Sequence, residues 1–264
     1  MTDALPQSVR AQLEDPFAEL TGSLVTARKL SLEVVATERI SPSLQRIVLA
    51  SPGLADFSYA PGQDIMLLVA AEGRRPVRRR YTIRLLDRAA GTVSLVVVLH
   101  GDGPGERWIR TAAPGDRIEG IGPRGKITTS PGADWHLFMG DESALSAIWA
   151  MTESLPGDAD ATIVIEVPGP DDEQELLAPA RTRVSWLHRL GGLAGDPALL
   201  AAEAAEVELP PGDGHAYVFG EASVVLRLRE ILAGRGLRQD QISPKAYWGR
   251  GRANAGHGEP AKDA

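Results

Sequence analysis

The chain has 264 residues, a length that suits one large domain or two ordinary ones. Hydrophobic residues make up 43% and charged residues 24%, which is an ordinary soluble balance. The net charge of −7 argues against nucleic acid or an anionic membrane as a partner. The absence of cysteine excludes disulfides, thiolate metal sites and a cysteine nucleophile, and no residue is assigned to a metal. No apolar run approaches the roughly 20 residues of a membrane span, and residues 1–10 lack a signal pattern, so a cytoplasmic protein is expected.

Residues 28–130 read as an antiparallel β-barrel that follows an N-terminal extension, residues 1–27. Short apolar runs alternate with glycine and proline turns, a pattern typical of strands at close spacing. The predicted strands are Leu30–Thr37, Leu44–Leu49, Ile65–Ala70 and Val93–His100.

An arginine-rich stretch, Arg78 to Arg84, lies between two of these buried strands. Arginine makes bidentate hydrogen bonds to phosphate. Side chains alternate along a strand, so Arg79 and Tyr81 share a face, and the tyrosine ring could stack on a flat heterocycle. Thr82 could hydrogen-bond a ring edge. The stretch therefore suits a flavin nucleotide, and the alternative is a solvated edge strand whose charges prevent aggregation.

The loop His100 to Trp108 offers a second candidate phosphate contact. Its glycines, among them Gly101, Gly103 and Gly105, expose backbone N–H groups that lead into a short helix at Arg107–Thr111, an arrangement that can cradle a pyrophosphate. A plain connecting loop is the alternative, and it is favoured if the loop is considered alone.

Residues 131–250 change character and alternate apolar runs with helical stretches, followed by a polar tail, residues 251–264. This β-α-β pattern predicts a parallel sheet covered by helices. The predicted strands are Trp135–Met139, Ala161–Val167, Val184–Leu187 and Ala216–Phe219, and the predicted helices are Ser143–Ser154 and Ala222–Ala233. The pattern does not settle whether Ala194–Glu206 is helix or loop.

Two similar turns join strand to helix in this half, Gly140-Asp141-Glu142-Ser143-Ala144 and Gly220-Glu221-Ala222-Ser223. Ligands bind at the carboxyl ends of strands in open α/β sheets, and helix N-termini attract phosphate. However, Asp141 and Glu142 would repel a phosphate placed against them. The alternative is that Asp141 or Ser143 only caps the helix.

The order and spacing of these motifs resemble the siderophore-interacting protein family, the flavin-dependent ferric-siderophore reductases of the ferredoxin reductase superfamily. The resemblance covers about Leu32 to Arg250. It rests on the following segments: Arg79-Arg80-Tyr81-Thr82, the loop 100–108, Pro114-Gly115-Asp116, Gly122-Pro123-Arg124-Gly125, Ala133-Asp134-Trp135, the segments 140–145, 169–174 and 186–189, Gly220-Glu221-Ala222-Ser223, and Tyr247-Trp248-Gly249-Arg250-Gly251.

The resemblance implies an N-terminal FAD-binding barrel and a C-terminal NAD(P)H domain. It implies that Arg79 contacts the FAD phosphate, that Tyr81 and Thr82 form the catalytic face of the flavin site, and that His100 and Gly101 continue it. The pyrophosphate would lie on residues 103–107, including Gly103, Gly105 and Arg107. The residues Gly140, Asp141, Glu142, Ser143, Ala144, Gly220, Glu221, Ser223 and Trp248 would face the nicotinamide cofactor. Glu106 departs from the family pattern and places a negative charge near the expected pyrophosphate.

The implied reaction passes electrons from NADH or NADPH through FAD to a ferric siderophore, so that iron leaves as Fe(II). A ferredoxin is an alternative donor, and a monomer is expected. Because ferric siderophores are often anionic, a basic pocket is expected, with Lys126, Arg250 and Arg78 as candidate substrate contacts. Two other classes stay open: a general flavin reductase or electron-transfer flavoprotein, and a siderophore-binding protein without enzymatic activity.

Overall fold

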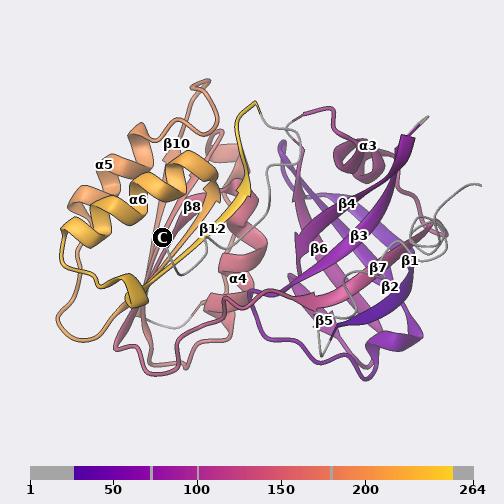
Figure 1. The fold of residues 1–264 in the computed structure, drawn as a ribbon, viewed down its shortest axis with the longest axis horizontal. Helices are drawn as coiled ribbons and strands as arrows, with labels where there is room; N and C mark the ends of the chain where they lie inside the picture. The colour runs from indigo at the N-terminus through magenta and orange to yellow at the C-terminus, as the bar shows by residue number, and fades with distance from the viewer. Residues whose placement is uncertain (1–26, 72–73, 100, 179–180, 252–264) are drawn as a thin grey trace, which may run out of the picture.

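The computed structural model describes residues 27–71, 74–99, 101–178 and 181–251. Within these ranges the chain forms two sheets, one of seven strands and one of five. Figure 1 shows the antiparallel sheet and the helix-covered parallel sheet side by side, with the last strand between them.

The first sheet has the strand order β4-β3-β7-β1-β2-β6-β5. Its strands are β1 (Arg28–Arg39), β2 (Leu44–Ala50), β3 (Asp64–Ala71), β4 (Arg74–Thr82), β5 (Leu85–Asp87), β6 (Thr92–Val98) and β7 (Arg117–Arg124). All printed pairings are antiparallel. The sheet curls into a half-barrel (Figure 1), and its edge strands, β4 and β5, are not neighbours in the strand order. This confirms the predicted antiparallel barrel, with an open side.

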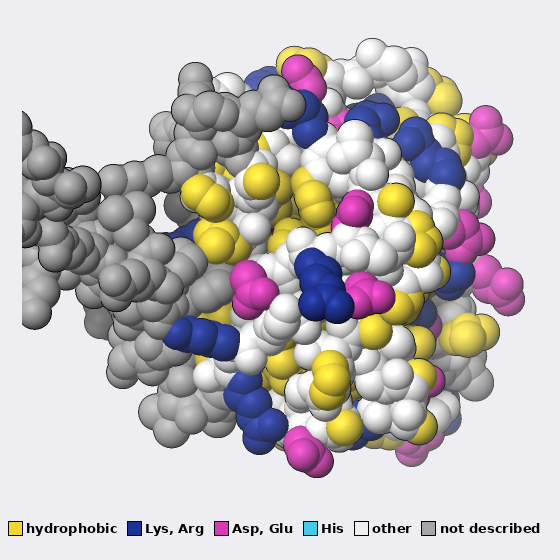
Figure 2. Space-filling model, turned by 90° about the vertical axis from the view of Figure 1, so that its right-hand side faces the viewer, with side chains coloured by type: hydrophobic (Ala, Val, Ile, Leu, Met, Phe, Trp, Pro, Cys, Tyr) yellow, Lys and Arg dark blue, Asp and Glu magenta, His cyan; other side chains and the backbone are white. Residues whose placement is uncertain are grey.

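Alternation of apolar and polar residues explains why the half-barrel has one buried face. In β1, Leu30, Leu32 and Val34 are buried while the residues between them are not. They pack with residues from the other strands and with Ile109 of the short helix α3 (Pro104–Thr111). The outer face carries acidic and basic side chains interspersed with hydrophobic ones (Figure 2).

The second sheet has the order β10-β9-β8-β11-β12, and every printed pair in it is parallel. Its strands are β8 (Trp135–Asp141), β9 (Asp160–Val167), β10 (Arg181–His188), β11 (His215–Glu221) and β12 (Ile242–Trp248). The first strand, β8, is central, so the chain reverses direction across the sheet between β8 and β11. Such a switch point is where doubly wound folds bind ligands, at the carboxyl ends of the strands.

Helices cover both faces of the parallel sheet (Figure 1). The helix α4 (Leu145–Glu153) lies toward the half-barrel, whereas α5 (Ala198–Glu206) and α6 (Ala222–Gly234) cover the other face. Successive side chains of β8 point to opposite faces of the sheet. Phe138 packs with α4, whereas Leu137 and Met139 pack with α5 and α6. Both faces are buried, which explains the continuous apolar runs in these strands.

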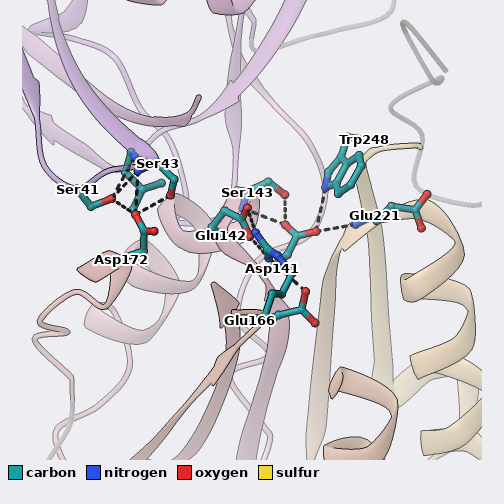
Figure 3. Close-up of polar contacts among 11 residues, drawn as sticks. Ser41, Ser43, Asp141, Glu142, Ser143, Glu166, Asp172, Glu221 and Trp248 are labelled. Carbon is teal, nitrogen blue, oxygen red and sulfur yellow. Dashed lines mark hydrogen bonds and ion pairs between the residues drawn. The ribbon is translucent and has the colours of Figure 1, made fainter. Parts of the chain in front are cut away.

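Several polar contacts join the two halves. Asp172, in a short 3-10 turn (Pro170–Asp172), accepts hydrogen bonds from the hydroxyls of Ser41 and Ser43 at 2.5 and 2.8 Å (Figure 3). Arg84 pairs with Glu153 of α4 at 2.6 Å. These contacts hold α4 and the parallel sheet next to the half-barrel.

Ser146 makes a contact of a different kind between the halves. Its hydroxyl accepts from the Val96 N–H at 3.1 Å and donates to the Val96 carbonyl at 3.0 Å. The partner strand β5 pairs only with Thr92 to Ser94 of β6. Ser146 therefore satisfies a backbone position of β6 that β5 is too short to reach.

The predicted elements agree with the structure, with shifts of a few residues at the ends. Helix α3 begins at Pro104 rather than Arg107, because proline is well tolerated in the first turn of a helix. The unsettled stretch 194–206 contains α5, of which only Leu200 and Ala204 are buried. Within the described ranges, no helix combines the length and apolarity needed to cross a bilayer. The division at residues 27/28, 130/131 and 250/251 stays a prediction.

Candidate functional site

The arginine-rich strand β4 brings Arg79 and Tyr81 against the first turn of α3. A Cβ atom added at Gly105 would lie 2.7 Å from the Tyr81 hydroxyl and 3.1 Å from Arg79 Cγ. Only glycine allows this approach. Two segments that the sequence singled out separately, the strand and the glycine loop, therefore meet.

The amino end of α3 is open to an anion. Gly103 is its N-cap, Pro104 occupies the first turn, and no side chain caps the helix. The first N–H groups of a helix lack intrahelical partners and carry the positive end of the helix dipole. Together with the neighbouring Arg79, this end fits a phosphate group.

The Glu106 carboxylate lies at that end, but it already has partners. Its carboxylate accepts from the Gly101 N–H and pairs with Arg110 at 2.5 Å. Arg107 donates to the Asp102 carbonyl. The negative charge expected to oppose a pyrophosphate is thus balanced locally. His100 lies outside the described residues.

Tyr81 is half-buried and packs against the core of the half-barrel, and burial raises the pKa of its phenol well above the usual range. The phenol is therefore neutral at physiological pH. A neutral aromatic ring beside a phosphate site suits stacking on a flat heterocycle.

The other arginines of the stretch have structural partners. Arg80 pairs with the buried Asp64 at 2.5 Å, and Asp64 also lies 3.3 Å from Nζ of the buried Lys245 in β12. Arg84 is held by Glu153 and lies over the Trp149 ring at 5.0 Å. Arg78, a predicted substrate contact, is exposed. Arg80 is thus held within the half-barrel and Arg84 is held by α4, whereas Arg79 lies against the first turn of α3.

The residue next to Tyr81 touches the other half of the protein. Thr82 is buried, and its hydroxyl lies 3.2 Å from the Tyr247 hydroxyl near the end of β12. Phe219 packs edge-on against Tyr247 with ring centroids 5.9 Å apart. Tyr247 belongs to the motif Tyr247-Trp248-Gly249-Arg250-Gly251, but the sequence pattern predicts no role for it. No local signal reveals the contact, because 165 residues separate the pair.

At the carboxyl edge of the parallel sheet, the Asp141 carboxylate is fully engaged by the protein (Figure 3). One oxygen accepts from the N–H of Ser143 at 2.9 Å and from the Ser143 hydroxyl. The other accepts from the Glu221 N–H at 3.0 Å and the Trp248 indole at 2.9 Å. Asp141 therefore ties together the ends of β8, β11 and β12. Burial, and secondly the charge of Glu142, raise the pKa of Asp141 to about 6.

The second strand–helix turn repeats this device. Glu221 accepts from the N–H groups of Ser223 and Val224, at 2.6 and 3.1 Å, and so caps α6. Its other oxygen accepts from the Arg250 N–H at 3.0 Å. Gly220 has φ +129, and a Cβ there would lie 2.6 Å from Asp141 Oδ2. At both turns, therefore, an acidic side chain caps the helical turn that follows it, as the capping alternative predicted for Asp141.

Glu142, Glu166 and Arg189 form a buried cluster at the same edge. Arg189 pairs with Glu142 at 2.6 Å and with Glu166 at 3.2 Å. Burial raises the pKa of Glu166 to about 7, although Arg189 opposes this shift. The single guanidinium of Arg189 thus pairs with two carboxylates. Glu166 and Arg189 were not among the predicted site residues.

Two predicted substrate contacts, Lys126 and Arg250, are exposed. Lys126 follows Gly125, whose carbonyl accepts from Gln63 and which lies close to Asp64 and Lys245. Arg250 follows β12 and joins Glu221 through its backbone. Lys126 thus lies near the point where Lys245 of β12 meets the half-barrel, and Arg250 lies beside the turn before α6. The predicted roles of all these site residues stay predictions.

The antiparallel half-barrel followed by a five-stranded parallel sheet with helices is the ferredoxin reductase-like arrangement that the sequence predicted. A siderophore utilization protein from T. fusca has the same fold, with a TM-score of 0.79 and 33% identity over 88% of this chain and 97% of that one. Two family models match: the siderophore-interacting FAD-binding domain at residues 65–127 and the siderophore-interacting protein at residues 133–251.

The chain belongs to the siderophore-interacting protein family. The ferric vibriobactin reductase ViuB of Vibrio cholerae is 30% identical over 84% of this chain and 89% of its own length. The NADPH-dependent ferric-chelate reductase of Escherichia coli is 28% identical over 94% of this chain and 98% of its own length. The predicted family and fold class are confirmed, and the chain carries an FAD-binding domain.

Proposed function

We propose that this protein is an FAD-dependent ferric-siderophore reductase that passes electrons from NADH or NADPH through FAD to the ferric chelate. The observation that carries the proposal is the packing of Arg79 and Tyr81 against the uncapped end of α3. This corner lies in a chain whose relatives include ferric reductases.

In this proposal, Arg79 and the first N–H groups of α3 hold the FAD phosphates. Arg107 and the loop from His100 to Gly105 extend that contact. Tyr81 supplies a flat neutral ring for the isoalloxazine, and the Thr82 hydroxyl lies at its reactive edge. When bound, the flavin supplies the conversion of a hydride pair into single electrons.

The nicotinamide cofactor is proposed to bind at the carboxyl edge of the parallel sheet. Gly140 and Gly220 let the strand ends pack closely at that edge, against Phe219 and Asp141. In this proposal Ser143, Ala144, Ser223 and Trp248 line the same edge. The three acidic residues of these turns are proposed to position the site and not to contact the cofactor. Asp141 holds the Glu221 backbone, Glu142 holds Arg189, and Glu221 caps α6. Tyr247 brings the end of β12 to Thr82, so the donor side and the flavin side meet.

The acceptor is proposed to be an anionic ferric siderophore attracted by Arg78, Lys126 and Arg250. Hard oxygen ligands hold Fe(II) less tightly than Fe(III), so one-electron reduction releases the metal. No nucleophile or general acid is needed for this reaction. A ferredoxin as donor and a monomeric, cytoplasmic state remain part of the proposal.

The proposal is tested by purifying the protein, identifying its released flavin by chromatography and assaying ferric-chelate reduction with a ferrous-specific dye. FAD and donor-dependent Fe(II) formation are expected. A colourless protein that binds the ferric chelate would instead favour the non-enzymatic alternative. A yellow protein that reduces free flavin but no chelate would favour a general flavin reductase.

A further inference from the structure

The three helix N-termini near the proposed sites differ in their availability to phosphate. No side chain caps α3. By contrast, Asp141 accepts from the Ser143 N–H in the turn before α4, and Glu221 accepts from two N–H groups of α6. The capping carboxylates are both buried. The first N–H groups of α3 are therefore uncapped within the described ranges, although the Glu106 carboxylate lies nearby at Gly101. At the sheet edge, negative charge already occupies the start of α6 and of the 3-10 turn that leads into α4.

The segment that follows the second strand of the sheet is also acidic. Residues 166–175 contain five carboxylates and no lysine or arginine: Glu166, Asp171, Asp172, Glu173 and Glu175. The cation beside them, Arg189, is 7% exposed and already pairs with Glu142 and Glu166. In doubly wound folds, the end of the second strand is where the adenosine ribose lies. An acidic residue there binds its 2′-hydroxyl, and an arginine accommodates a 2′-phosphate.

Glu166 lies at the end of β9, next to its last residue, and only one of its two carboxylate oxygens has a partner in the part of the chain that the structure describes. Its side chain is 2% exposed, and Oε1 faces Arg189 at 3.2 Å. Oε2 is buried and has no hydrogen-bond partner among the described residues. Figure 3 shows the Glu166 carboxylate beside Asp141 at the strand ends. A buried polar oxygen without a partner is costly. A ribose hydroxyl can donate to a carboxylate or accept from a carboxylic acid, whereas a phosphate at neutral pH brings negative charge to the acidic segment.

We propose that the α/β domain takes the nicotinamide dinucleotide with a free 2′-hydroxyl, NADH, and rejects the 2′-phosphate of NADPH. This inference rests on the proposed function only in placing a nicotinamide cofactor at the carboxyl edge of the sheet. It goes beyond that function by choosing the donor. It also separates this chain from the Escherichia coli relative, whose name specifies NADPH.

Equilibrium binding to the FAD-loaded protein tests the inference without turnover. Isothermal titration with NAD⁺ and NADP⁺ at low salt should give a dissociation constant at least about tenfold larger for NADP⁺, a factor that corresponds to roughly 1.4 kcal/mol. Because repulsion is screened over about 10 Å at 0.1 M salt, the ratio of the two constants should shrink as salt is added.

A double charge-reversal variant tests whether the acidic segment causes the preference for NAD⁺ over NADP⁺. Asp171 and Glu173 are exposed, and Asp171→Lys with Glu173→Lys should shift the ratio toward NADP⁺ by roughly fivefold. The matched control is Asp56→Lys with Glu119→Lys, which makes the same charge change at two exposed positions of the half-barrel. The control should leave the ratio unchanged. A ratio that moves equally in both variants would overturn the local assignment.

The remaining outcomes separate this inference from the proposed function. Equal affinities, or tighter NADP⁺ binding, would overturn the inference and leave the reductase proposal standing. Binding of neither nucleotide, with Fe(II) still formed from a reduced ferredoxin, would overturn both the inference and the nicotinamide part of the proposed function. A salt-independent preference for NAD⁺ would overturn the electrostatic explanation.

Discussion

The hydroxyl of Thr82 lies 3.2 Å from the hydroxyl of Tyr247, so the last strand of the α/β domain touches the half-barrel one residue after Tyr81. The contact joins the proposed flavin edge to the end of β12. In Figure 1 that end lies on the same side of the molecule as α3.

The Thr82–Tyr247 contact should have a measurable coupling energy. Thr82→Val and Tyr247→Phe each remove one hydroxyl, and each should lower the free energy of unfolding by about 0.5–1.5 kcal/mol. Denaturant titration of the two single variants and the double variant gives the coupling. Fully additive losses would show that the two hydroxyls do not interact.

Arg79→Ala should weaken FAD binding by roughly 10- to 100-fold, because a charge-assisted hydrogen bond contributes about 1.5–3 kcal/mol. The matched control is Arg117→Ala on the outer face, where the side chain is 76% exposed. Equilibrium titration of the flavin-free protein with FAD provides the measurement. Equal affinities in the two variants would contradict a phosphate contact at Arg79.

Gly105→Ala should also lower FAD affinity while the protein stays folded. The added methyl group would lie 2.7 Å from the Tyr81 hydroxyl and displace the first turn of α3. Gly157→Ala is the control, since a Cβ there meets nothing within 4 Å. Circular dichroism establishes folding and fluorescence titration measures the FAD affinity. Wild-type affinity in Gly105→Ala would show that this close approach is not needed.

The raised pKa of Glu166, about 7, predicts how stability depends on pH. Between the ordinary carboxyl pKa and pH 7, Glu166 binds its proton more often in the folded state than in the unfolded state. The contribution of Glu166 to the free energy of unfolding therefore falls as pH rises through this range. Glutamine cannot ionise. Relative to wild type, Glu166→Gln should therefore gain thermal stability on going from pH 5.5 to pH 8. A constant difference in melting temperature across that range would contradict the shifted pKa.

The double change Lys126→Ala, Arg250→Ala should raise KM for an anionic ferric siderophore and flatten its salt dependence, while FAD content stays the same. Attraction of an anionic chelate is screened by salt. The control replaces Arg46 and Arg227 by alanine, two exposed arginines with surface ion-pair partners. An unchanged KM and salt slope in the site variant would place the chelate elsewhere.

Much of the fold could be predicted from the sequence because its strands are local apolar runs. The period-two pattern of β1 and the continuous runs of β8 and β9 mark one-sided and two-sided burial directly. The pattern of α5 was indecisive, because most of its nine residues are alanine or leucine but only Leu200 and Ala204 are buried.

The candidate site was only partly predictable. The motif around Arg79 and Tyr81 is contiguous, and so is the loop leading to Gly105. The remaining contacts depend on residues far apart in the chain. Asp64 meets Lys245 across 181 positions, and Arg189 reaches Glu142 across 47. Such pairings leave no spacing that a sequence pattern can register.

The central claim is tested most directly by a single turnover without oxygen. The FAD-loaded protein is reduced with one equivalent of NADH and mixed with a ferric siderophore and a ferrous-specific chelator. The account predicts that the oxidised flavin absorbance returns at the rate at which the ferrous complex appears, with about two Fe(II) for each FAD. Flavin that stays reduced, or that is reoxidised without any ferrous complex, would contradict a ferric-siderophore reductase.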